Sequence, residues 1–197
     1  MTHLPVRPAV VSVHASPTHD FSKPARASIH LIAHHGVAGD AHAGEHDQHR
    51  FHIKRYGLHP NLRQVHLMHA ELFDALASRG HTVPPGALGE NIRTRAVDLL
   101  ALPAGTRLHL GPTAVVELTG LRNPCVQIER YQPGLLARLV ERTEAGVVRK
   151  AGVMSVVLSG GGVSPGDPIE IELPSPPFEA LTYLPPGAGR GKRHVVR

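Results

Sequence analysis

Short runs in which apolar and polar residues alternate fill most of the chain, and Gly or Pro residues separate them. Such runs are typical of half-buried strands, whereas a continuous apolar run suits a fully buried strand. The pattern predicts strands at residues 10–14, 28–32, 64–68, 153–158 and 169–173. Residues 106–110 and 113–118 are joined by Gly111 and Pro112, and they predict a tight hairpin.

Helical spacing is clear in only two segments. Apolar residues recur every three or four positions over residues 69–78 and 133–142, and Gly80 and Gly146 follow the expected helix ends. Three glycines, residues 160–162, lie between the last two predicted strands. Many short strands with two peripheral helices indicate a mostly β (α+β) fold, either a β-barrel or a tightly curled sheet.

Length and composition divide the chain into one domain and a tail. A chain of 197 residues can form one domain with a sizeable core, and it is too short for two full-sized domains. From Pro174 onward, Pro and Gly are so frequent that little of the segment can be buried. We therefore expect a domain over residues 10–173 and an extended, basic Pro/Gly-rich tail over residues 174–197.

The chain is basic, with a formal net charge of +5, but its Lys and Arg residues are scattered. The one dense basic group is Arg190, Lys192, Arg193 and Arg197. We interpret this group as a solvated tail rather than an arm that binds nucleic acid. Aromatic residues make up only 4% of the chain, which nearly excludes stacking platforms for single strands. We expect an aliphatic core and no nucleic-acid partner.

The sequence has no pattern typical of membrane insertion or export. No stretch approaches the roughly 18 consecutive apolar residues that a membrane span needs. Pro5 and Pro8 interrupt the region where a signal peptide would lie. A single thiol without an export signal fits the reducing cytoplasm. We therefore expect a cytoplasmic protein with no membrane partner.

One cysteine, Cys125, accompanies sixteen histidines. A lone thiol excludes internal disulfides, four-cysteine zinc sites and protein-held iron–sulfur clusters. Asn123 and Pro124 favour a turn after the predicted strand, so we expect the thiol at an accessible rim. Arg122 is close in sequence, and a nearby guanidinium favours the reactive thiolate. A buried cysteine that packs as a small apolar residue is the alternative.

Histidines crowd the first third of the chain and raise the alternative of a zinc site. They are His30, His34, His35, His42, His46, His49 and His52. A helix would place His42, His46 and His49 on one face. The carboxylates that could complete such a site are Asp40, Glu45 and Asp47. Several glycines argue against a helix here and no H-E-x-x-H motif is present, so a solvated loop is favoured over a histidine-bound zinc site.

Residues 84–92 have too little apolar periodicity for a helix or a strand, but their glycines would let a ligand approach the backbone closely. The segment includes Glu90 and Asn91, whose side chains can hydrogen-bond a ligand at a fixed place. A structural turn is the alternative. The chain has no P-loop, no dinucleotide fingerprint and no G-x-S-x-G elbow, so nucleotide hydrolysis, nicotinamide chemistry and serine hydrolysis have no support.

Taken in order, these segments resemble the MOSC domain family, which is named for the C-terminal domain of molybdenum cofactor sulfurase. The similar segments are GDAHAG (39–44), PGALGENI (85–92), TGLRNPC (119–125), GVM (152–154) and GDPI (166–169). One of these motifs alone would be a weak signal, whereas five in the same order make a chance resemblance improbable. The similarity covers residues 10–173, so the predicted domain resembles a standalone MOSC domain of the bacterial type.

The resemblance implies a MOSC-type β-barrel that handles the molybdenum cofactor (molybdopterin) or its sulfur. Standalone bacterial members and the amidoxime-reducing relatives reduce N-hydroxylated small molecules by removing an oxygen atom. On this basis we expect a molybdenum-dependent reductase with a small-molecule substrate. A carrier of sulfur (as a persulfide) or of molybdenum cofactor, without catalysis, is the first alternative, and the histidine-bound zinc protein is the second.

The resemblance also assigns roles to the residues already singled out. Cys125 would be the molybdenum ligand, and a thiolate is a suitable donor for it. Asn91 and Glu90 would line the pocket beside the metal, and Arg122 would contact the anionic groups of the cofactor. Asp40 and His42 would shape the rim or supply a proton.

The chain departs from the family pattern in ways that affect its chemistry. Ala41 stands where an arginine is often found, which removes one candidate phosphate or substrate contact. No aminotransferase-like domain is present, so no bound pyridoxal phosphate is expected from this chain alone. No flavin, nicotinamide or iron–sulfur signature is present either. We therefore expect a separate electron-transfer protein, or a sulfur donor, as partner.

Overall fold

The computed structural model describes residues 7–48, 53–54, 57–144, 146–185 and 188. Most of the strands pair in one large sheet, in the order β13-β7-β8-β11-β5-β6-β1-β2. Along the chain these strands are β1 (Ala9–His14), β2 (Ala25–Arg26), β5 (Val65–His69), β6 (Ile92–Arg95), β7 (Arg107–Leu110), β8 (Ala114–Leu121), β11 (Val153–Ser159) and β13 (Ile169–Glu172). Neighbouring strands are antiparallel except β5 and β6, which are parallel.

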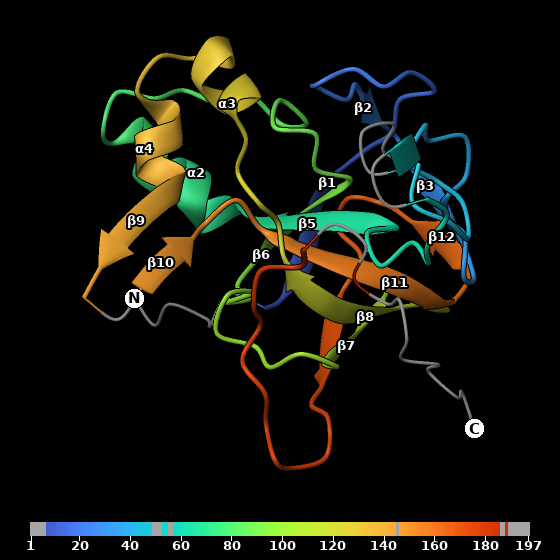
Figure 1. Cartoon of the computed structure of the whole chain (residues 1–197). Helices are drawn as coiled ribbons and strands as arrows, with labels where there is room; N and C mark the ends of the chain where they lie inside the picture. Colours follow the sequence, from blue (N-terminus) through green and yellow to red (C-terminus); the bar gives the residue numbers. More distant parts are fainter. Residues whose placement is uncertain (1–6, 49–52, 55–56, 145, 186–187, 189–197) are drawn as a thin grey trace, which may run out of the picture.

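Two small sheets and the helices lie at the ends of the large sheet (Figure 1). One small sheet pairs β12 (Gly161–Val163) with β3 (Ile29–Ile32) and β3 with β4 (Gly36–Val37). At the other end lie α2 (Ala70–Ala77), α3 (Val126–Tyr131), α4 (Leu135–Leu139) and the hairpin of β9 (Val140–Thr143) and β10 (Gly146–Arg149). The mostly β (α+β) prediction is therefore confirmed.

The predicted closed barrel is not confirmed, because β13 and β2 remain the two edges of the large sheet. The first and last strands meet only at their starts, where Val10 N donates to Asp167 O and Ile169 N donates to Pro8 O. One isolated bridge joins Ala9 to Pro168. Because Pro8 and Pro168 have no N–H group, they cannot donate to a ladder that would extend this contact.

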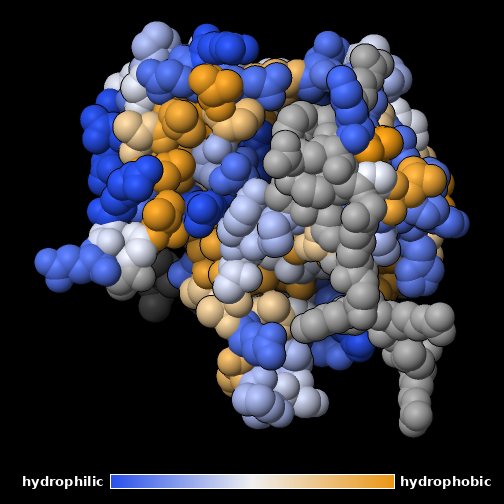
Figure 2. Space-filling model, in the orientation of Figure 1, coloured by the Kyte–Doolittle hydropathy of each residue, from blue (hydrophilic) through white to orange (hydrophobic). Residues whose placement is uncertain are grey.

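The interior is almost entirely aliphatic, as the composition predicts. The larger core cluster is built from Val, Leu, Ile and Ala side chains of the sheets, with Leu31, Leu67 and Leu108 among those fully buried. A second cluster packs under the helices and includes Phe73 and Leu139. Apolar side chains also reach the surface over α3, α4 and the β9–β10 hairpin (Figure 2).

One predicted helix is wrong in extent. The helix expected over residues 133–142 ends at Leu139, because Val140 turns to an extended backbone and pairs with Arg149 in the hairpin. Gly161 and Gly162 form part of β12, a strand that was not predicted, where Gly161 pairs with Leu31 and Gly162 with His30. The short helix after Cys125 and strand β6 had no clear periodicity in the sequence.

The segment after β13 is more ordered than its composition predicts. Leu181 and Leu184 are buried, so the expectation that little of this segment is buried is wrong for these residues. The basic group at residues 190–197 lies outside the described residues. Among the described residues, no helix combines the length and apolar character needed to cross a membrane.

Candidate functional site

The PGALGENI segment forms a tight loop that is closed by the buried carboxylate of Glu90. Glu90 Oε1 accepts hydrogen bonds from Gly86 N at 2.8 Å and from Arg93 Nη2 at 2.7 Å, and Oε2 accepts one from Leu88 N at 3.2 Å. Gly86 has a φ of +78°, and a Cβ at this position would lie 2.1 Å from the carbonyl oxygen of Lys23. The loop therefore requires glycine here and binds the Lys23 backbone closely.

Asn91 links three parts of the fold with its side chain. Its Nδ2 donates to His14 O and to Asp40 Oδ2, each at 3.2 Å, and its Oδ1 accepts from His66 N at 3.2 Å. Its backbone N–H also donates to His66 O. Because both Nδ2 hydrogens and Oδ1 are engaged inside the protein, Asn91 fixes Asp40 relative to β1 and β5.

Asp40 is a buried carboxylate with several donors. Lys23 Nζ lies 2.8 Å from Oδ2 and 3.0 Å from Oδ1, and the backbone N–H groups of Ser16 and His42 also donate to the carboxylate. Burial opposes ionisation, but hydrogen bonding from His42 and the charge and hydrogen bond of Lys23 outweigh it, so the pKa of Asp40 is well below its usual value. Asp40 is therefore ionised at neutral pH.

His42 lies at the rim between Asp40 and solvent. Its Nδ1 lies 3.4 Å from Asp40 Oδ1, and its side chain is 38% exposed. The ring also meets His19 edge to face, with 5.0 Å between the centroids. His42 therefore lies between the buried Asp40 carboxylate and the solvent-exposed rim.

Lys23 is a member of this site that the sequence gives no motif to identify. Burial lowers the pKa of its ammonium group, and the charge of Asp40 acts in the opposite direction. The residue reaches the site because its backbone N–H donates to Gly86 O at 2.8 Å. A single lysine before a short strand belongs to no sequence motif. Its place in the site is visible only in the folded protein, where it contacts the PGALG loop.

Cys125 lies where it was expected, on the connection that leaves β8. Its backbone is extended and caps the start of α3, and its thiol is partly exposed with Sγ 3.4 Å from Gln127 Oε1. The alternative of a fully buried cysteine is therefore wrong. No hydrogen bond among the described residues joins Cys125 directly to Asn91, Asp40 or His42.

Arg122 interacts electrostatically with Cys125 and also with titratable groups in the other part of the site. Its backbone N–H donates to Gly152 O, and its Nη1 is shielded from solvent with no hydrogen-bond partner among the described residues. Burial lowers the pKa of the guanidinium, and the electrostatic influence of Cys125 and Glu90 opposes that shift. The charge of Arg122 in turn lowers the pKa of both His66 and Lys23. Arg122 therefore lies within electrostatic reach of both halves of the site.

Two buried histidines complete the basic surroundings. His66 places Nε2 2.8 Å from Ala151 O, and burial, with the charge of Arg122, holds its pKa well below 6.5. Burial also lowers the pKa of His14, whose two ring nitrogens have no partner within hydrogen-bond distance among the described residues. Both rings are neutral at pH 7. Arg122 forms no ion pair with another described residue, so its positive charge has no direct partner there.

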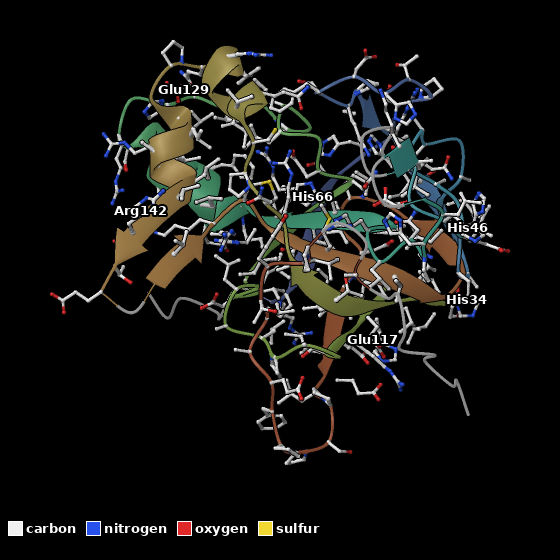
Figure 3. The ribbon with its side chains drawn as sticks, viewed as in Figure 1. His34, His46, His66, Glu117, Glu129 and Arg142 are labelled. Carbon is white, nitrogen blue, oxygen red and sulfur yellow. The ribbon has the colours of Figure 1, made fainter. Side chains whose placement is uncertain are left out.

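The histidine-rich segment does not assemble a metal site among the described residues, where no three His, Cys, Asp or Glu side chains converge. His34 and His46 lie at one end of the molecule, and His66 lies near its centre (Figure 3). His49 and His52 lie outside the described residues. Of the carboxylates considered for zinc, Asp40 binds Lys23 and Asp47 binds Arg63 and His59.

A surface hollow of the described structure lies beside the GDAHAG segment. It measures about 510 Å³, and Arg26, His30 and Gly39 are among the residues that line it. A hollow of about 290 Å³ lies near Arg107 and Glu172. Neither hollow includes Cys125.

Comparisons with known proteins agree with this geometry. The family model described as the MOSC domain matches residues 38–170. This range contains Asp40, His42, Glu90, Asn91, Arg122 and Cys125. No curated protein shows significant sequence similarity to the chain.

Solved structures share the fold at low sequence identity. The YuaD protein from Bacillus subtilis is similar with a TM-score of 0.69 and 23% identity, over 85% of this chain and 97% of that one. YiiM from Escherichia coli is similar with a TM-score of 0.59 and 18% identity, over 89% and 74%. YiiM from Geobacillus stearothermophilus gives 0.57 and 18%, over 84% and 75%.

Proposed function

The chain belongs to the MOSC domain family, and from this we propose that it binds molybdenum cofactor with Cys125 as the metal ligand and reduces N-hydroxylated small molecules. The family resemblance supplies the cofactor and the reaction class. Whether molybdenum cofactor fits this chain is judged from the residues around Cys125. The cofactor is an anion, so its site needs a thiolate ligand and positive charge close together.

The observation that carries the proposal is the shielded, unpartnered Nη1 of Arg122, which lies close in sequence to a partly exposed thiol. A buried donor without a partner is costly, and such atoms are rare in folded proteins. An anionic group that bonded this guanidinium would satisfy the donor and neutralise its charge. Arg122 and Cys125 are separated by two residues in the chain, so one ligand could contact both.

The remaining side chains have separable tasks in this proposal. Arg122 holds positive charge near the thiol, and Lys23 holds positive charge beside Asp40. Glu90 and Asn91 keep the PGALG loop and Asp40 in place. When bound, molybdenum cofactor supplies a metal centre that can accept an oxygen atom and exchange electrons. Asp40 stays ionised, so His42 rather than Asp40 would carry a proton from solvent.

Reduction of an N-hydroxylated amine breaks its N–O bond and yields the amine and water. The balance requires a pair of electrons and a pair of protons for each substrate molecule. Protons can enter at His42, which is open to solvent. Because the chain carries no flavin, nicotinamide or iron–sulfur signature, we propose that the electrons come from a separate electron-transfer protein.

A carrier of sulfur or of cofactor is the second candidate function. The partly exposed thiol at the start of α3 favours it, because transfer to another protein requires an accessible sulfur. This candidate needs no electron donor and no substrate pocket. It predicts a persulfide on Cys125, or a bound cofactor, without reductase turnover.

Metal and pterin analysis of protein purified from a cofactor-competent host tests the proposal. Wild-type protein should hold molybdenum and pterin together, Cys125→Ser should lose the molybdenum, and Arg122→Met should lose most of both. Arg130→Met is the matched control, since it removes an exposed arginine of α3 and should retain the cofactor. Far-ultraviolet circular dichroism checks that each variant is folded.

Three results would overturn the proposal. Cofactor retained in full by Cys125→Ser would exclude the cysteine as a required ligand. Persulfide on Cys125 in protein that holds no molybdenum would favour the carrier. Stoichiometric zinc that survives Cys125→Ser but not His42→Ala would favour the histidine-bound zinc protein.

A further inference from the structure

The segment after β13 returns to the sheet and pairs with the end of β8 (Figure 1). Leu121 N donates to Thr182 O at 2.8 Å, and Leu121 forms a parallel bridge with Tyr183. A second attachment lies nearby, where Ala104 N donates to Glu179 O at 2.8 Å. We call residues 179–184 the C-terminal strap. It is therefore bonded to the strand that leads into the Cys125 loop.

Close packing holds the strap in this place. Gly120, one residue before the bridge, has no room for a side chain, because a Cβ would lie 2.9 Å from Thr182 O and 3.1 Å from Leu184 Cβ. Leu181 and Leu184 are buried, and the Leu184 carbonyl accepts a hydrogen bond from Arg63 Nη2. The strap is thus an integral part of the domain up to Leu184.

From the strap, Tyr183 reaches the Cys125 loop through Arg149. The Arg149 guanidinium lies 4.9 Å from the centroid of the Tyr183 ring, within the range of a cation–π contact. Arg149 Nε donates to Asn123 Oδ1 at 3.3 Å. Asn123 lies two residues before Cys125, and the buried Pro124 between them stiffens the backbone.

The loop has a second attachment to the same region. Arg122 N donates to Gly152 O at 3.0 Å, three residues after Arg149. The two residues that lead to Pro124 are therefore held by one short segment, residues 149–152. A change in the position of Arg149 would alter the path of the backbone toward the thiol.

We propose that Tyr183 and Arg149 are positioning residues for Cys125, so that the C-terminal strap forms part of the functional site. The ring of Tyr183 orients the Arg149 guanidinium, which holds Asn123 and thereby restricts the exposure of the thiol. The inference rests on the proposed function only in treating Cys125 as a functional residue. It concerns the protein before any cofactor binds.

Alkylation of the thiol tests this inference directly. Cys125 is the only cysteine, so iodoacetamide modification followed by intact mass reports a single site. Cofactor-free protein from a host that cannot make molybdenum cofactor is used throughout. Tyr183→Ala and Arg149→Ala should each release the loop and increase the second-order rate constant by roughly three- to tenfold.

Two further variants separate positioning from a general loss of structure. Tyr183→Phe keeps the ring over Arg149 and should react at the wild-type rate. Phe178→Ala removes an exposed aromatic side chain just before the strap and should have no effect. The double variant Tyr183→Ala/Arg149→Ala should react no faster than the quicker single variant, because both changes break the same chain of contacts.

The inference is overturned if Arg149→Ala reacts at the wild-type rate, or if the effects of Tyr183→Ala and Arg149→Ala multiply in the double variant. Arg149 lies on an exposed hairpin, so this arm remains valid even if Tyr183→Ala does not fold. Absence of molybdenum in the cofactor analysis, with these rate effects intact, would reject the proposed function and leave the positioning role. Cofactor binding without the rate effects would reject the positioning role and leave the proposed function.

Discussion

Lys23 and Asp40 form an ion pair that is almost entirely withdrawn from solvent. Lys23 Nζ lies 2.8 Å from Oδ2 and 3.0 Å from Oδ1 of Asp40, and the two side chains are only 5% and 2% exposed. Asn91 Nδ2 binds the same carboxylate at 3.2 Å. The pair therefore joins the loop before β2 to the GDAHAG segment and to the loop that contains Asn91.

Removal of one partner should cost far more than removal of both. Lys23→Met leaves a buried carboxylate without its cation and should lower the free energy of unfolding by about 3 to 5 kcal/mol. The double variant Lys23→Met/Asp40→Asn removes both charges and should recover part of this loss. Urea unfolding measures all the values. Equal stability of Lys23→Met and wild type would show that the pair contributes nothing to folding.

Gly86 should tolerate no side chain. Gly86→Ala introduces a Cβ at a φ of +78° and 2.1 Å from Lys23 O, so we expect a loss of about 3 kcal/mol or more. Gly80→Ala is the matched control, because Gly80 has a φ of +85° but faces open space. It should cost about 1 kcal/mol, from backbone strain alone. Similar losses in the two variants would contradict a close approach at Gly86.

Asn91→Asp should destabilise the protein in a pH-dependent way. It replaces an Nδ2 donor by a carboxylate oxygen about where Nδ2 now lies, 3.2 Å from Asp40 Oδ2. Two adjacent carboxylates cannot both ionise easily, so the new carboxyl should have a raised pKa. The loss in stability should be large at pH 7.5 and smaller at pH 5. Asn91→Ala has no new charge, and its loss should be similar at both values; equal pH dependence of the two variants would reject the explanation.

Local patterns predicted several individual elements of this fold. Residues 10–14, 65–68 and 153–158 lie in strands, and residues 69–78 contain α2, because burial on one face leaves a period in the sequence. The helix expected over residues 133–142 is shorter than predicted and ends at Leu139, because Val140 pairs with Arg149 in the hairpin that follows it. That pairing depends on a later segment and leaves no period over residues 133–142.

Motifs singled out residues that the fold brings together, but they did not indicate the contacts between them. Asp40, His42 and Asn91 are joined by hydrogen bonds and short contacts, and their functional roles stay predictions. The sequence could not identify Lys23 and Tyr183 as residues near the site, because each contacts a partner that is distant in sequence. The contact between Lys23 and Asp40 spans 17 residues, and Tyr183 pairs with Leu121 across the whole β11–β13 region.

Buried histidines should make stability decline as the pH falls from 7.5 to 5.5. The pKa of folded His66 lies well below 6.5, the usual value, because burial and Arg122 disfavour the charged ring. Below pH 6.5 the unfolded chain binds a proton that the folded chain does not, so protonation favours unfolding. His66 alone should cost about 1.4 kcal/mol at one pH unit below that value. Burial also lowers the pKa of His14 and His69, which act in the same direction.

His66→Gln tests this origin of the pH dependence, since glutamine can donate to Ala151 O but does not titrate. We expect a variant that is less stable than wild type at pH 7.5 and loses less stability on acidification, measured by urea unfolding at both values. His30→Gln removes an exposed histidine of β3 and should keep the wild-type slope. Asp40 does not contribute to the change in stability between pH 7.5 and 5.5. The stability that its lowered pKa provides is fully present above its unfolded pKa near 3.8 and is lost only below that value. An unchanged slope in His66→Gln would mean that other groups govern the acid sensitivity.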